Sequence, residues 1–213
     1  MRLLRSGGRR GALTAAATAC ASAGAGLLAL AFQHELTTPP PLPAAAQATP
    51  RGTGLSQPPT AASVVLPRSV PQRITAPGTG LDTAIDAVGL AEDGSVALPK
   101  NVDHAGWFTG SVTPGERGNA IIVGHVDSTT GPAAFYSLGK LSSGDRITVQ
   151  RRDGRAATFT LTRTAVYDKN HFPSDLVYGP TQGSQLTLIT CTDWDSNAHE
   201  YRANLVLTAQ LAR

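Results

Sequence analysis

Three residues with the side chains needed for acyl transfer stand at the ends of apolar runs. Cys191 ends the run TLITC (187–191), His125 ends the run 119–125, and Arg202 lies at the start of the last apolar segment. A thiol is nucleophilic as its thiolate, an imidazole moves protons near neutral pH, and a guanidinium can hydrogen-bond an oxyanion. The pattern predicts a cysteine acyl-transfer site with Cys191 as nucleophile, His125 as general acid and base, and Arg202 as oxyanion-binding cation.

The cysteine count narrows the role of the thiol without deciding it. The other cysteine, Cys20, lies in the apolar N-terminal run, so Cys191 has no disulfide partner in the rest of the chain. An unpaired thiol of this kind is either an inert core residue or a nucleophile. The order of His125 before Cys191 excludes the papain-like arrangement, in which the cysteine comes first.

Further polar residues near these three are candidates for substrate binding. Thr190 precedes the nucleophile and either holds substrate or only fills the strand. Asp127 is two residues after His125, on the same side of an extended chain, so it either orients the imidazole or belongs to a turn. His104, in the run VDHAGW, either lines the cleft or lies in a surface loop. We expect no cofactor. We also expect no metal, because the acidic residues that follow Cys191 (Asp193, Asp195 and Glu200) are typical of a solvated loop.

The elements that must position these residues are mostly short strands separated by Gly, Asp and Pro turns. We expect strands at 82–88, 119–123, 146–151, 156–168, 185–191 and 201–210, with short helices at 133–138 and 174–178. Asp153-Gly154 lies between two alternating runs, which favours a hairpin. This spacing predicts an all-β domain over residues 74–213 that forms one closed or nearly closed barrel.

The N-terminal third has a different composition. Four arginines precede residues 12–32, which carry no charge and are long enough to span a bilayer with the N-terminus inside. The motif Ala29-Leu30-Ala31 leaves a cleaved signal peptide as the alternative. We therefore expect a membrane segment over 1–33 and a single-pass protein with its catalytic domain outside the cell.

The segment that follows is expected to be a stalk. Residues 34–73 hold nine of the fifteen prolines and cannot bury a core; their one apolar cluster is Val64-Val65-Leu66. Residues 1–73 carry seven arginines and one glutamate, a net charge of +6, which leaves −3 for residues 74–213. A mildly acidic domain without a basic stripe makes nucleic acid a poor partner.

The motifs together resemble those of a known family. TLITC matches the TLxTC motif of sortases, and His125 and Arg202 stand where sortases carry their histidine and arginine. The text IIVGHVDS (121–128), followed by Gly131-Pro132-Ala133 and Phe135-Tyr136, is similar to actinobacterial class F sortases, and to class E sortases to a lesser degree.

The resemblance covers about residues 74–213 and implies a closed eight-stranded barrel. It also implies a Gram-positive cell-wall transpeptidase that cleaves a Thr–Gly bond in the sorting signal of a surface protein. The acyl group would then pass through a thioacyl enzyme to an amine of a cell-wall precursor. Two alternatives stay open: a hydrolase with water as acceptor, and a non-catalytic wall-binding barrel in which Cys191 is structural.

Overall fold

The computed structural model describes residues 65–213. The expected membrane segment and nearly all of the expected stalk therefore lie outside the described residues. Within residues 65–213 no helix has both the length and the apolar character needed to cross a membrane.

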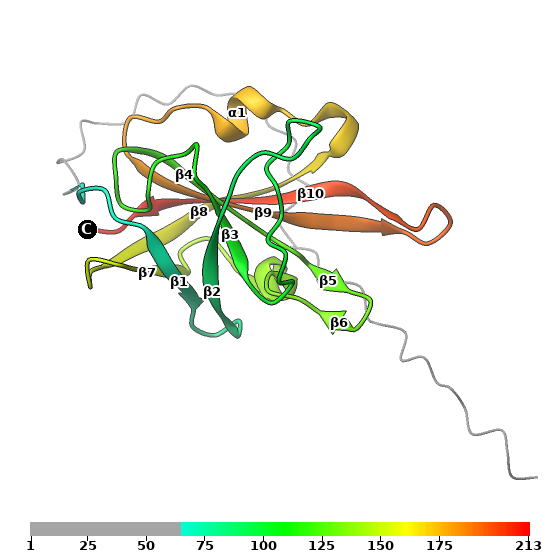
Figure 1. Ribbon diagram of the computed structural model, residues 1–213, viewed down its shortest axis with the longest axis horizontal. Helices are drawn as coiled ribbons and strands as arrows, with labels where there is room; N and C mark the ends of the chain where they lie inside the picture. The colour runs from blue at the N-terminus through cyan, green and yellow to red at the C-terminus, as the bar shows by residue number, and fades with distance from the viewer. Residues whose placement is uncertain (1–64) are drawn as a thin grey trace, which may run out of the picture. The chain divides into compact units, whose positions relative to one another are not determined.

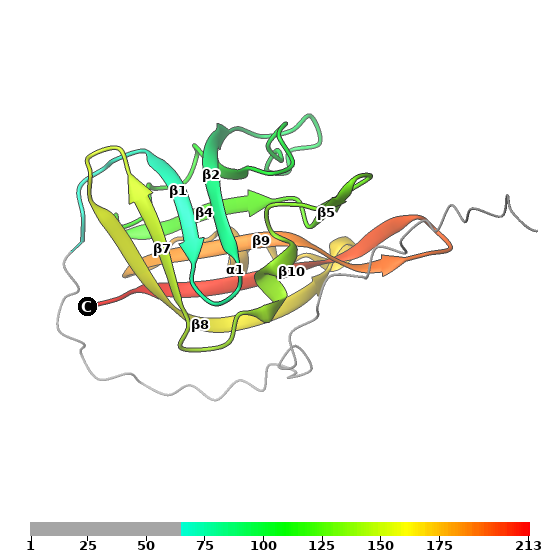
Figure 2. The ribbon, with the colours of Figure 1, turned by 90° about the horizontal axis from the view of Figure 1, so that it is seen from below.

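Eight strands close into a barrel, as predicted (Figures 1 and 2). Around the barrel their order is β1-β2-β3-β4-β9-β10-β8-β7, with antiparallel neighbours except for the parallel pairs β2–β3 and β4–β9. The strands are β1 (Pro71–Ala76), β2 (Leu81–Val88), β3 (Ala105–Phe108), β4 (Gly118–Gly124), β7 (Arg146–Arg151), β8 (Ala156–Asp168), β9 (Ser184–Asp195) and β10 (Glu200–Leu211).

Short elements lie outside the barrel wall. After β4 come the two-residue strands β5 (Asp127–Ser128) and β6 (Gly131–Pro132) and the 3-10 helix η1 (Tyr136–Lys140). A second 3-10 helix, η2 (Lys169–His171), and the single-turn helix α1 (Ser174–Tyr178) connect β8 to β9. The expected helix at 174–178 is confirmed as α1, whereas the one expected at 133–138 is a 3-10 helix two to three residues later.

Burial explains why the sequence shows two kinds of strand. In β7, Ile147 and Val149 point into the barrel and alternate with more exposed residues. In β4, Ile122 faces the barrel interior, while Ile121 packs outside with Val177 of α1. A strand covered on both faces reads as a continuous apolar run, and this is the reason that 119–123 and 185–191 stand out in the sequence.

One correction concerns the chain after Cys191. Residues 192–195 were expected to be a loop, but β9 continues to Asp195 and pairs with β10 as far as Glu200. The two strands project beyond the barrel as a long hairpin (Figures 1 and 2). Cross-strand packing of Trp194 against Tyr201, with ring centroids 4.9 Å apart, stabilises this extension. Cys191 is therefore inside a strand and not at its end.

Residues 66–70, here called the strap, join the barrel just before β1. Leu66 and Val70 pack against the core, and the backbone N–H of Leu66 donates to the Gly115 carbonyl at 2.8 Å. The fully buried Arg151 donates to the carbonyls of Pro67 and Pro114.

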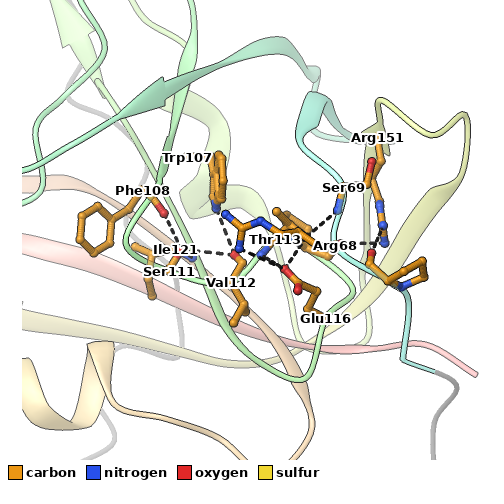
Figure 3. Close-up of polar contacts among 12 residues, drawn as sticks. Arg68, Ser69, Trp107, Phe108, Ser111, Val112, Thr113, Glu116, Ile121 and Arg151 are labelled. Carbon is orange, nitrogen blue, oxygen red and sulfur yellow. Dashed lines mark hydrogen bonds and ion pairs between the residues drawn. The ribbon is translucent and has the colours of Figure 1, made fainter.

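Figure 3 shows how polar groups tie the strap to the loop after β3. The backbone N–H of Ser69 donates to Thr113 Oγ1 at 3.0 Å, and that hydroxyl donates to Glu116 at 2.6 Å. Residues 66–73, expected in the stalk, thus form part of the barrel, with residues 71–73 opening β1.

Candidate active site

The side chains of the TLITC segment make different contacts. Thr187 donates from Oγ1 to Asn119 of β4 at 2.7 Å, and Leu188 lies in the barrel core. Ile189 packs on the outer face, and Thr190 donates to the carbonyl of Gly124 at 2.8 Å. Both threonines are almost completely buried. Their hydroxyls fasten β9 to β4, so the motif fixes the strand that carries Cys191.

Cys191 borders a cavity of about 540 Å³ on the outer face of the barrel. Val123, Ile189 and Asn204 form its base on β4, β9 and β10. The chain between β2 and β3 lines one part of it with Ser95 to Leu98, and the segment from Lys169 to Tyr178 lines another. The thiol is half-buried at this cavity and is not sealed in the core. This position fits a nucleophile better than a structural thiol.

The parallel pairing of β4 and β9 brings His125 near Cys191. Val123 pairs with Ile189, and His125 and Cys191 each follow two residues later. Residues two apart on an extended chain share a face, so Cys191 lies on the outer face with Ile189, and His125 comes directly after β4 at the matching position of the register. His125 follows the end of β4, and its Nε2 lies 3.1 Å from the Pro99 carbonyl. The ring thus contacts the chain that enters β3.

Gly124 sets the position of the backbone just before His125. A Cβ on this residue would lie 2.7 Å from Cγ of Phe135, whose ring is fully buried. Real Cβ atoms do not approach that closely, and the ring has no free space to retreat into. The Gly124-His125 pair in the sequence therefore marks a place where the strand end lies directly on an aromatic ring.

Arg202 shares the outer face with Cys191 but not the cavity. Cys191 pairs with Asn204, and Arg202 is two residues earlier on β10. Its Nη2 lies 2.9 Å from Asp195 Oδ2, and its side chain is 56% exposed. Hydrogen bonds from the backbone N–H groups of Asn197 and Ala198, together with the Arg202 charge, hold the pKa of Asp195 below its usual range. The guanidinium is therefore paired with a carboxylate that stays ionised.

Lys169 is a cavity residue that the sequence analysis did not single out. It starts η2, immediately after β8, and lines the cavity together with Cys191. Burial raises the pKa of the Cys191 thiol, whereas the Lys169 charge and a hydrogen bond from it lower that pKa, and the Asp127 charge raises it. No signal in the sequence marks Lys169, because it is 22 positions from Cys191 and belongs to no motif.

Asp127 and His104 contact partners other than His125. Asp127 accepts a hydrogen bond from the Tyr201 hydroxyl, which joins β5 to β10. Burial and this hydrogen bond raise the pKa of Tyr201. His104 precedes Ala105, which pairs with Gly124, so continuing this register sets His104 opposite His125. The His104 ring lies 3.0 Å from Asp86 of β2.

Only some of the predicted site residues line the cavity. Cys191 and Thr190 line the cavity, although the Thr190 hydroxyl is bound to the Gly124 carbonyl. In residues 65–213, the lining does not include His125, Arg202, Asp127 or His104. A thiol, an imidazole, an ammonium and a guanidinium nevertheless share one end of the barrel. That set can activate a thiol, move a proton and stabilise an oxyanion.

Comparisons with known proteins agree with this description. The profile of the Sortase domain family matches residues 74–212. Sortase A from Listeria monocytogenes is a similar solved structure, with 20% identity, a TM-score of 0.52, and coverage of 69% of this chain and 89% of that one. The sortase D5 transpeptidase of Clostridium perfringens is 20% identical, with a TM-score of 0.51, and the match covers 68% of this chain and 79% of that one. Sortase A from Corynebacterium diphtheriae is 22% identical, with a TM-score of 0.52, and the match covers 69% of this chain and 62% of that one. No curated protein sequence matches the chain. Structural likeness at these identities shows a shared fold.

Proposed function

The chain belongs to the sortase family of cysteine transpeptidases, and from that premise we propose that it cleaves a C-terminal sorting signal with Cys191 and transfers the acyl group to an amine. The observation that carries the proposal is the position of Cys191. It directly follows a stretch of β9 that two buried threonine hydrogen bonds fix to β4, and it borders a cavity large enough for several side chains.

In the first half of the reaction, the Cys191 thiolate attacks the scissile carbonyl carbon, and the carbonyl oxygen takes the displaced electron pair. The resulting oxyanion is stabilised by Arg202 once the guanidinium turns from Asp195. Collapse of the intermediate breaks the C–N bond, and the leaving amine takes a proton from the His125 imidazolium. A thioester on Cys191 remains. Thr190 contributes by its hydrogen bond to Gly124, which holds the Cys191 and His125 strands together.

In the second half, an acceptor amine attacks the thioester and gives its proton to the now neutral His125. The C–S bond breaks, an amide forms, and the thiolate–imidazolium pair is restored. With ordinary pKa values, about 3% of thiols and about 24% of imidazoles are in the required form at pH 7, so about 1% of uncoupled molecules hold both. Because burial raises the pKa of Cys191, nearby positive charge is needed to keep that fraction from falling further.

The cavity also supports a general picture of the substrate. Its lining is mainly apolar, with Val96, Leu98, Val123, Phe172 and Ile189, and polar groups lie around it. An extended peptide with an apolar side chain fits such a lining. We further propose that Asp127 and His104 bound the substrate path at its edge, on β5 and just before β3.

The finer assignments are also part of the proposal. The text around His125 supports a class F sortase, or failing that a class E one. The arginine-rich N-terminus and the uncharged run 12–32 support a membrane anchor with the catalytic domain outside a Gram-positive cell. The substrates would then be surface proteins that carry sorting signals, and the acceptor a cell-wall precursor amine.

The test is a product assay with the purified chain, a panel of sorting-signal peptides, and amines such as diaminopimelate-containing peptides or triglycine. We expect mass spectrometry to detect an amide between the peptide fragment and the amine, and we expect no product with Cys191→Ala. If every cleaved peptide ended in a free carboxylate, even at high amine concentration, the enzyme would be a hydrolase and the transfer step would be refuted.

A further inference from the structure

Lys169 holds a position in the cavity that the reaction scheme above does not use. It lies directly after β8, whose last residue, Asp168, pairs with Ala203 of β10. Lys169 is the residue after Asp168, and Arg202 is the residue before Ala203, so both cations lie directly beyond the last pair of this ladder. Asn204 pairs with Cys191 on one side and Tyr167 on the other. Tyr167, Asn204 and Cys191 therefore form one row across the three strands, and the two cations lie beyond that row at the same end of the barrel.

The two cations differ in their partners. Arg202 is paired with Asp195 at 2.9 Å, so its charge is largely offset. Lys169 lines the cavity with Cys191, and no ion pair of Lys169 occurs among the ion pairs of residues 65–213. Its own neighbour Asp168 instead accepts from the backbone N–H of Asn170 at 2.7 Å. The uncompensated positive charge beside the thiol is thus that of Lys169.

The remaining charged and titratable groups around Cys191 are of both signs. The Asp127 carboxylate opposes thiol ionisation, whereas the Lys169 charge and its hydrogen bond favour it. The other charged or titratable groups on the elements around the site are Glu92 and Asp93 before β3, His125 after β4, Arg163, Tyr167 and Asp168 on β8, His171 on η2, Asp175 and Tyr178 on α1, Asp193 and Asp195 on β9, and Glu200, Tyr201 and Arg202 on β10. The His171 ring lies 3.5 Å from Asp168. Asp93 accepts hydrogen bonds from the hydroxyl and the backbone N–H of Ser95.

We propose that Lys169 is a further catalytic residue of this site, whose ammonium group stabilises the thiolate form of Cys191 from the cavity side, against the effect of burial, while Arg202 stays with Asp195 until substrate enters. The proposal rests on the assignment of Cys191 as the nucleophile. The two cations then have separate tasks: Lys169 favours ionisation of the Cys191 thiol, and Arg202 stabilises the oxyanion. A lysine is suited to the first task because its ammonium is a compact point charge.

The experiment measures iodoacetamide alkylation of the full chain between pH 5.5 and 10, in a Cys20→Ser background that leaves Cys191 as the one thiol. Lys169→Met removes the charge at similar length, and Lys169→Arg keeps it. Lys140→Met is the matched control, since Lys140 is an exposed lysine on η1 that does not line the cavity. Arg202→Met tests the rival cation.

We expect Lys169→Met to slow alkylation at pH 7 by roughly three- to tenfold and to match the parent at the alkaline plateau. Lys169→Arg should restore most of the rate, and Lys140→Met and Arg202→Met should leave the profile unchanged. High salt should slow the parent but not Lys169→Met, because an exposed charge is screened. A Lys169→Met profile that superimposes on the parent, or a loss that appears with Arg202→Met instead, would overturn the proposal.

A separate peptide-transfer assay on the same proteins distinguishes the two claims. Lys169→Met should lower transfer at pH 7 and recover at higher pH, which a purely structural role would not produce. If the parent alkylates as expected but transfers no acyl group, the proposed function fails and the role of Lys169 stands. If acyl transfer is normal and the alkylation profile is the same with and without Lys169→Met, the proposed function stands and the role of Lys169 fails.

Discussion

Removing residues 65–69, which include all of the strap except Val70, should destabilise the barrel far more than five residues suggest. A chain of residues 70–213 keeps β1 whole but loses the Pro67 carbonyl, which binds the buried guanidinium of Arg151. It also loses the Leu66 side chain from the core edge and the Leu66 backbone hydrogen bond to Gly115. Arg151 keeps the Pro114 carbonyl at 3.1 Å and Asp153 at 3.1 Å, so its charge is left only partly satisfied.

The size of the effect follows from these contacts. A hydrogen bond to a charged group contributes about 1.5–3 kcal/mol, and a half-buried leucine contributes about 1 kcal/mol. With the remaining backbone hydrogen bonds, and some relief as water reaches the guanidinium, we expect 70–213 to be about 3–5 kcal/mol less stable than 65–213. That is a large part of the 5–15 kcal/mol typical of a domain. Starting the chain at residue 74 should be worse, because it also cuts β1.

Urea unfolding of both chains, each with and without Arg151→Met, measures this directly. The cycle should give a coupling of about 1.5–3 kcal/mol between the strap and Arg151, since removing the arginine matters less once its partner is gone. Equal midpoints for 65–213 and 70–213, with coupling below about 0.5 kcal/mol, would refute the reasoning. The domain would then begin at β1, and the strap would contribute nothing.

Three other predictions concern the site. Thr190→Val should cost about 1–2 kcal/mol of stability in thermal unfolding, because it removes a buried hydrogen bond to the Gly124 carbonyl. We also expect kcat/KM to fall about tenfold, because this bond positions the strand that carries Cys191. Equal activity would remove the positioning role of Thr190. Arg202→Lys should impair transfer nearly as much as Arg202→Ala, since lysine lacks the planar fork of the guanidinium. Asp195→Asn should retain transfer, because it frees the guanidinium of Arg202. A near-normal rate for Arg202→Lys in steady-state kinetics would contradict this. Because burial raises the pKa of Cys191, the midpoint of its alkylation against pH should lie above the ordinary value of about 8.5, with thiolate lost as pH falls through it; a midpoint below that value would mean that positive charge outweighs burial.

The sequence predicts the barrel well where strands have a strong pattern. The alternation of β7 and β8 and the apolar runs of β4 and β9 each place a strand within a few residues. β3 was missed because its four residues, AGWF, are too short for a period and include a glycine. β1 was missed because a proline-rich segment continues into it, and its buried residues Pro71, Ile74 and Ala76 do not alternate regularly.

The site was predicted only in so far as its residues belong to motifs. Cys191 and His125 come together because β4 and β9 are parallel, and each has a motif. Lys169 reaches Cys191 through two successive registers, β8 with β10 and β10 with β9, which no local pattern encodes. The Asp195 partner of Arg202 was hidden for a similar reason. The residues after Cys191 have the composition of a loop, and it is the packing of Trp194 on Tyr201 that extends the hairpin.

The central claim is that Cys191 carries the acyl group, and the intact mass of the protein after an acid quench tests it most directly. Mixed with a cleavable sorting-signal peptide and no amine, the wild-type chain should gain the mass of the peptide's acyl part. Proteolysis of the quenched protein should place that mass on the fragment that contains Cys191. That mass should disappear when an amine is added, as the amide product forms, and it should never form on Cys191→Ala. Peptide cleavage that proceeds in Cys191→Ala, or a covalent adduct on any other residue, would contradict the account.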